Sequence, residues 1–200
     1  MKLKDFKRKM IKPVFSVEEA MRVAFATNPN TLKLQLHQWT ESGDLVRLKR
    51  GLYTFPDKQV SRTEIAKVLY SPCYISLEYA LNFYAFLPDV VFQMTLVTPK
   101  TTRKLVTPSG LFIYHRIKPD LFWGFDPSTL MGEKEKVILD YLYLNSGRLH
   151  PLDDFWRQER WQNLETVDFR KALRWAPKFS KKTAVLVKSL RDYWGKNGST

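Results

Sequence analysis

Side chains suited to binding a nucleic acid gather between residues 28 and 50 of the chain. Amide, hydroxyl and imidazole groups can hydrogen-bond the edges of bases, whereas Lys and Arg neutralise phosphates. We expect base-edge contacts from a first cluster and phosphate or minor-groove contacts from a second. The first cluster is Asn30, Thr31, Lys33, Leu34 and His37, and the second is Arg47, Lys49 and Arg50. Asn28 and Asn30 would also suit a phosphate if a helix begins beside them.

Two short helices are expected to carry the first cluster. Ser16 and Glu19 have the spacing of a capping box, which predicts a helix over residues 17–25. The turn at residues 27–30 contains a proline and two asparagines, and a second helix follows over residues 31–41. Two short helices around a tight turn, the second with a polar outer face, are typical of a helix-turn-helix.

A basic hairpin is expected to carry the second cluster. Residues 45–55 alternate as two strands around a tight turn at Arg50 and Gly51, which points Arg47 and Lys49 outward. A basic hairpin directly after such a helix is a wing, and residues 1–58 are therefore predicted to be a winged helix-turn-helix DNA-binding domain. Winged helices also serve as protein-interaction modules, and outward basic side chains are often merely solvated, so both alternatives stay open.

The rest of the chain, residues 59–200, predicts a domain of the α+β class. Ser61 and Glu64 form a second capping box before a short helix. Apolar spacing and alternation then predict a helix from residue 77, a strand over 90–98, strands at 105–106 and 111–114, and helices over 133–145, 153–161, 167–176 and 180–194. The fold class is therefore α+β, with the winged helix followed by a mixed domain that has a small antiparallel sheet and C-terminal helices.

Positive charge is concentrated at the two ends of the chain. The net charge is +13, of which +6 lies in residues 1–60, +2 in 61–131 and +5 in 132–200. Such an excess favours a polyanionic partner, because neutralising phosphates releases counterions. Accessory phosphate contacts are expected from a connecting segment and from two helical faces, although these cations could equally be solvated or receive an acidic partner. They are Lys100, Arg103, Lys104, Arg170, Lys171, Arg174 and Lys181.

Signals for catalysis or cofactor binding are missing from the sequence. The three histidines have no companions at ligand spacing, and no phosphate-binding glycine loop or nucleophile elbow is present. Cys73 follows a proline in an apolar setting and is interpreted as a buried small residue. We therefore expect no metal, no cofactor and no catalytic residues. The single cysteine, the absence of an apolar span and the absence of a secretory leader predict a cytoplasmic protein that does not enter membranes.

Five segments resemble the AbiEi-type antitoxin family. They are GDLVRLKRGLY at 43–53, YISLEYAL at 74–81, TPKTTR at 98–103, IKPDLFWGF at 117–125 and EKVILDYLY at 135–143. The resemblance covers roughly residues 15–145 in order, and the turn at 27–30 departs from the small-residue turn usual in the family.

Membership of that family implies a function with two parts. The resemblance implies an antitoxin of a bacterial type IV toxin–antitoxin and phage-defence module, whose winged helix binds and represses its own promoter. It also implies that residues 59–200 act as the antitoxin domain against a nucleotidyltransferase-like toxin, without a stable complex. The alternatives are a stand-alone regulator of the same shape, a nucleic-acid-processing enzyme built from scattered acids and lysines, and a protein-binding module.

Overall fold

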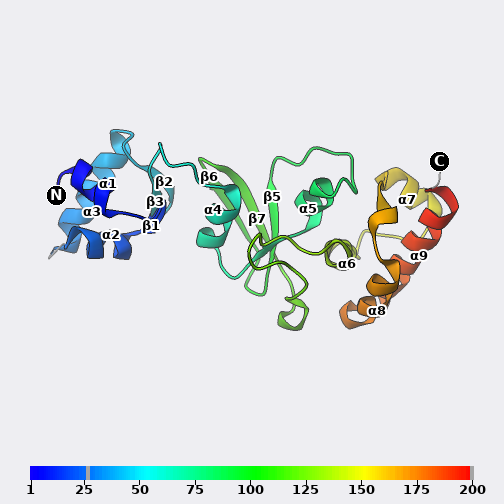
Figure 1. Cartoon of the computed structure of the whole chain (residues 1–200). Coiled ribbons are helices and arrows are strands. Elements are labelled where there is room, and N and C mark those ends of the chain that lie inside the picture. Colours follow the sequence, from blue (N-terminus) through cyan, green and yellow to red (C-terminus); the bar gives the residue numbers. More distant parts are fainter. Residues whose placement is uncertain (26–27, 199–200) are drawn as a thin grey trace. The chain divides into compact units, whose positions relative to one another are not determined.

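The computed structural model describes residues 1–25 and 28–198 (Figure 1). The chain forms two compact units. Unit 1 comprises Met1–Ser71 together with Val106–Gly110, and unit 2 comprises Pro72–Leu105 together with Leu111–Thr200. Together the elements give the α+β class expected from the sequence. None of the described helices is both long and apolar enough to span a bilayer.

Unit 1 has the element order of a winged helix-turn-helix. Its elements are α1 (Leu3–Lys9), β1 (Val14–Ser16), α2 (Val17–Ala24), α3 (Pro29–Glu41), β2 (Val46–Lys49), β3 (Leu52–Thr54) and α4 (Arg62–Leu69). The strands form an antiparallel sheet in the order β1-β3-β2, in which Val14 and Val46 both pair with Thr54. Neither α1 nor β1 is predicted by the sequence pattern, and α4 belongs to unit 1 rather than to the predicted second domain.

An aromatic cluster forms the core of unit 1. The Phe6 ring of α1 lies 5.4 Å from the Phe15 ring of β1 and 5.2 Å from the Trp39 ring of α3. Phe55 packs 5.3 Å from Phe15. Burial of each such side chain contributes about 1.5–3 kcal/mol, so α1 and β1 are integral to the unit that presents α3.

Local capping sets the start of α2 and of α3. The Ser16 hydroxyl accepts a hydrogen bond from the Glu19 N–H, and the Glu19 carboxylate accepts one from the Ser16 N–H, which confirms the first capping box. Asn28 caps α3, where Pro29 occupies the first helical position. The predicted turn included Thr27, which lies outside the described residues.

Unit 2 combines a four-stranded sheet with helices. Its elements are β4 (Tyr74–Ile75), α5 (Leu77–Phe83), β5 (Met94–Thr98), β6 (Arg103–Thr107), β7 (Gly110–Arg116), the 3-10 helices η1 (Pro119–Leu121) and η2 (Leu164–Thr166), α6 (Lys134–Leu144), α7 (Asp153–Glu159), α8 (Phe169–Phe179) and α9 (Lys181–Asn197). The tip of the β6–β7 hairpin, Val106–Gly110, belongs to unit 1. The sheet order is β4-β5-β7-β6; β4, which was not among the predicted strands, pairs antiparallel with β5, whereas β5 and β7 are parallel.

One predicted strand is shorter than expected. The alternation of residues 90–98 predicted a strand over the whole segment, but β5 begins only at Met94. Val90 and Phe92 are 73% and 85% exposed, so they do not face a core. Alternation marks a strand only when one set of side chains is buried, and here the first four residues remain in the connection after α5.

The centre of unit 2 contains a buried polar cluster on α6. The amine of Lys136 contacts the carboxylate of Asp140 one turn later, and both side chains are fully buried. The Tyr74 hydroxyl donates to Asp140 at 2.7 Å and the Ser76 hydroxyl at 2.9 Å. Burial lowers the pKa of Lys136 and raises the pKa of Asp140, with their mutual attraction opposing both shifts.

Candidate nucleic-acid interface

Helix α3 presents a polar face to solvent. Leu32 and Leu36 are buried, whereas the side chains predicted to read bases are all exposed: Asn30, Thr31, Lys33, Leu34 and His37. Leu34 is 57% exposed, so it does not cover the protein's own core. The helical repeat explains this division, because positions four apart share a face and the two buried leucines define the inner one.

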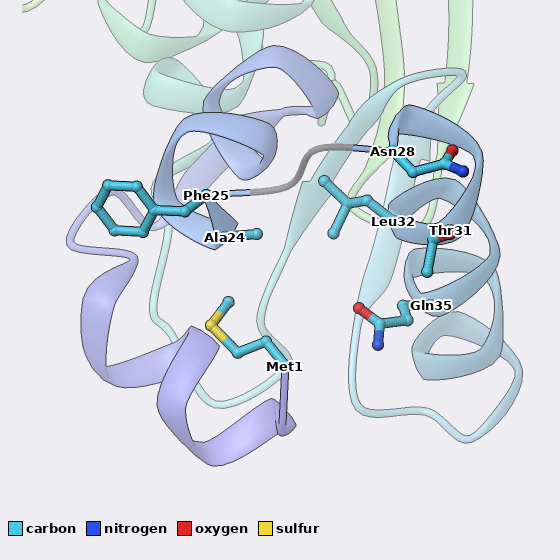
Figure 2. A pocket seen from close by; sticks show the side chains of 7 residues that line it. All are labelled: Met1, Ala24, Phe25, Asn28, Thr31, Leu32 and Gln35. Carbon is cyan, nitrogen blue, oxygen red and sulfur yellow. The ribbon is translucent and has the colours of Figure 1, made fainter.

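The polar groups at the N-terminus of α3 hydrogen-bond one another in a helix cap. The Asn28 side-chain oxygen accepts the Asn30 N–H at 2.9 Å, so this oxygen and this amide stabilise the helix end. Asn28 and Thr31 also line a pocket of about 210 Å³ between the end of α2 and α3. Figure 2 shows the side chains of Met1 and Leu32 pointing into this pocket. The Asn28 oxygen therefore acts as a helix cap, and the phosphate contact expected of Asn28 would fall to its NH₂ group.

We call the β2–β3 hairpin, residues 46–54, the wing. A groove of about 300 Å³ lies between the wing and α3. Four of the predicted DNA-contacting residues line it: Lys33 and His37 from α3, and Arg47 and Arg50 from the wing. All four are exposed. Thr40 and Tyr53 complete its polar lining. Two members of each predicted cluster thus share one concave surface, whereas Asn30, Thr31, Leu34 and Lys49 do not line it.

The turn of the wing depends on Gly51. Its φ of +78° lies in the left-handed region that side chains with a Cβ rarely adopt. The Gly51 carbonyl accepts a hydrogen bond from the Val17 N–H at 3.2 Å, which ties the turn to the first residue of α2. Val17 and Gly51 both line the groove, so this contact lies at its wall.

Lys49 is exposed, as the alternating pattern predicts, but its amine has a partner within unit 1. Its amine donates a hydrogen bond to the Leu69 carbonyl at the end of α4, so it connects β2 to α4. The register of β2 against β3 shifts between Arg47 and Lys49, which separates the directions of the two side chains. Of the three basic wing residues, Arg47 and Arg50 line the groove and Lys49 does not.

The accessory cations have different environments. Lys100, Arg103 and Lys104 are exposed, and the last two belong to β6 rather than to a connecting loop. The amine of Lys171 lies 2.6 Å from the Glu133 carboxylate and 3.0 Å from that of Glu135. These carboxylates raise the pKa of Lys171 and neutralise its charge, so the prediction that it projects with Arg170 and Arg174 is wrong. Arg170, Arg174 and Lys181 are exposed.

The sequence pattern did not predict α1, which packs against α3 through Phe6 and Trp39. Phe6 and Met10 are buried one helical turn apart, a spacing that could have identified α1. Residues 1–12 also contain six basic side chains and one acidic side chain, so they supply +5 of the +6 net charge of the first sixty residues. Among residues 1–25 and 28–198, no three His, Cys, Asp or Glu side chains converge as metal ligands.

Comparison with known proteins gives no relative: neither a protein-family model nor a curated protein matches the chain.

Proposed function

We propose that unit 1 binds duplex DNA, with the outer face of α3 in the major groove and the wing on the backbone. The observation that carries this proposal is the groove between them, in which Lys33, His37, Arg47 and Arg50 converge from two separate elements. In this arrangement Arg47 and Arg50 neutralise phosphates, whereas Lys33 and His37 face base edges. In the bacterial cytoplasm, the bound protein would occupy its own promoter and so repress transcription from it.

The salt dependence of binding tests the role of the wing. Each phosphate neutralised contributes a slope of about −0.9 to the plot of log affinity against log salt. We expect R47A/R50A to weaken binding to every duplex and to flatten this slope by about two. The measurement is fluorescence anisotropy with a duplex from the region upstream of the gene, between about 50 and 200 mM salt.

The matched control removes two exposed cations of unit 1 that lie outside the groove. Lys58 and Lys67 are both exposed, and neither lines the groove. K58A/K67A should keep the slope of the unaltered protein. If the salt slope flattens equally in R47A/R50A and K58A/K67A, or in neither variant, the wing does not provide the phosphate contacts.

Base reading by α3 is tested separately from affinity. We expect K33A and H37A to change the sequences recovered from a random duplex library, with a cost of about 1–3 kcal/mol for each lost base contact. R47A/R50A should recover the original sequences at lower affinity. The same preferred sequence from K33A and H37A would show that these side chains do not read bases.

We further propose that the protein acts as the antitoxin of a nucleotidyltransferase-like toxin without forming a stable complex with it, and that it catalyses no reaction. The support for this part is the resemblance of residues 15–145 to the AbiEi-type antitoxins. Co-expression with a nucleotidyltransferase encoded beside this gene tests it through growth. We expect R47A/R50A to lose repression and to keep protection, because the two roles use different parts of the chain.

The alternatives give different results in the same assays. A stand-alone regulator represses but gives no protection against the toxin. A protein-binding module does not bind the duplex from the region upstream of the gene at moderate salt. A nucleic-acid-processing enzyme cleaves DNA or RNA when a divalent metal is added to the pure protein.

A further inference from the structure

More than half of the net charge of the chain lies in one short segment of unit 2. Residues 169–190, which cover α8 and the first half of α9, contain seven Lys or Arg and no Asp or Glu. Lys171 is neutralised by Glu133 and Glu135, which leaves six cations. This segment is separate from the proposed DNA-binding groove, all of whose lining residues belong to unit 1.

Three of these cations form a line along the exposed face of α8. Arg170, Arg174 and Lys178 follow one another at intervals of four residues, and all three are exposed. Each interval corresponds to a rise of about 6 Å along the helix. The opposite face packs into unit 2 through Ala172, Ala176 and Phe179, so the cationic line is turned toward solvent.

No carboxylate relieves the repulsion within this line. Like charges four residues apart destabilise a helix, and none of these three side chains forms an ion pair in the part of the chain that the structure describes. Lys181 and Lys182 extend the positive charge into the first turn of α9, where the helix dipole also disfavours cations. An arrangement that is unfavourable for the isolated protein becomes favourable when an anion occupies it.

Two partly exposed indole rings adjoin the cationic line. Trp175 follows Arg174 on α8, and its ring centroid lies 4.8 Å from that of Trp123, which follows η1, with the two planes almost perpendicular. The amine of Lys178 lies 5.5 Å from the centroid of the Trp123 ring. The amine of Lys171, held by two carboxylates, lies 4.6 Å from the centroid of Trp175 and fixes that ring in position.

We propose that this cationic-aromatic surface, formed by Arg170, Arg174, Lys178, Lys181, Trp123 and Trp175, binds single-stranded nucleic acid. Successive phosphates lie along the cations, and an unpaired base stacks on an indole ring, replacing the Lys178 amine that now covers Trp123. A base within a duplex is already stacked on both faces and cannot make this contact, so the indole rings favour a single strand. This activity is independent of the proposed function of unit 1.

The first test is binding of fluorescein-labelled U15 and dT15 to the full chain, followed by anisotropy, with an unrelated 15-base-pair duplex alongside. We expect R170A/R174A to weaken binding of both single strands about tenfold near physiological salt and to lower the salt slope by about 1.4. K58A/K67A removes two exposed cations of unit 1 and should stay within about twofold of the unaltered protein. Stronger binding of U15 than of dT15 assigns the surface to RNA, and the reverse assigns it to DNA.

The second test separates stacking from charge. W175L keeps an apolar side chain at this position of α8 but removes the ring, and we expect it to weaken single-strand binding about fivefold to 150-fold. W175F should recover part of the loss. Circular dichroism and the urea midpoint establish that both variants are folded, and quenching of indole fluorescence by U15 should diminish in W175L.

Several results would overturn the proposal. They are equal affinity of R47A/R50A for the duplex and the single strands, unchanged single-strand affinity in folded W175L, and displacement of U15 by an equal charge of poly-glutamate, which would indicate an acidic protein partner. Loss of single-strand binding in R47A/R50A would assign it to the wing instead. The proposed DNA binding by unit 1 fails on different evidence, namely the duplex affinity and salt slope of R47A/R50A.

Discussion

Single side chains in this protein have roles that depend on their partners rather than on their type. Lys49, Lys136 and Lys171 are all lysines in basic or amphipathic segments, yet each is held by an acceptor within its own unit. Lys136 is the extreme case, because it is fully buried and its amine lies near three aromatic rings as well as Asp140. We therefore expect substitution of each of these lysines to affect stability and binding to different extents.

The Lys136–Asp140 pair gives a stability prediction. K136M leaves Asp140 buried without its cation, and removing one partner of a buried pair costs about 3–5 kcal/mol. K136M/D140N should recover part of this loss, because the neutral asparagine oxygen still accepts hydrogen bonds from Tyr74 and Ser76. Urea unfolding measures the free energy of unfolding of both variants. A double variant less stable than K136M would show that the charge on Asp140 is not the source of the cost.

Glu19 gives a prediction about pH. A hydrogen bond from Lys12, followed by one from the Ser16 backbone, holds the pKa of Glu19 below its usual value. A depressed carboxyl pKa stabilises the fold above the unfolded value of about 4.3, and this contribution disappears as pH falls through the lower folded value. We expect the stability difference between the unaltered protein and E19Q, measured by thermal unfolding, to shrink between pH 6 and pH 3. A constant difference would contradict this linkage.

Elements with strong local signals were predictable, and elements defined by distant partners were not. The capping box at Ser16, the helix end near Glu41 and the wing turn at Gly51 follow from nearest neighbours in the sequence. Strand β1 exists because Val14 pairs with Thr54, forty residues away, and three residues carry no periodicity of their own. The parallel pairing of β5 with β7 likewise depends on tertiary packing.

The candidate interface shows the same division. Helical spacing identified the exposed residues of α3, and the hairpin pattern identified Arg47 and Arg50. The pattern failed to reveal the partner of Lys49, because this acceptor is the Leu69 carbonyl on a helix twenty residues later. It also failed at Lys171, whose carboxylate partners lie on α6 and at its N-terminal cap. Periodicity predicts which side chains point outward, but it does not predict whether such a side chain is bound by a residue of another element.

The wing is the element whose geometry is easiest to perturb alone. G51A places a Cβ at a φ of +78°, which costs about 1–2 kcal/mol and shifts Arg50 relative to α3. We expect G51A to lower the duplex affinity together with the thermal midpoint. G147A, at a glycine without a positive φ and with open space around it, should change neither. An unchanged duplex affinity in G51A would mean that the turn does not position Arg50 for binding.

At the scale of the whole molecule, the +13 charge divides into surfaces with different chemistry. The groove of unit 1 offers hydrogen-bonding side chains beside two arginines, whereas α8 offers a line of cations beside indole rings. Net charge alone predicts only attraction to polyanions. The side chains that accompany the charge determine whether a paired or an unpaired strand fits.

Two independent surfaces should be occupied at the same time. Because none of the groove-lining residues belongs to unit 2, a saturating duplex from the upstream region should leave the affinity for U15 within about twofold at fixed salt, apart from the screened repulsion between the two ligands. Analytical ultracentrifugation with differently labelled ligands should then show both labels in one sedimenting species. Mutual exclusion that persists as salt rises would show that both ligands use the same cations. In that case R170A/R174A would weaken duplex binding as much as single-strand binding, and the second surface would be part of the first.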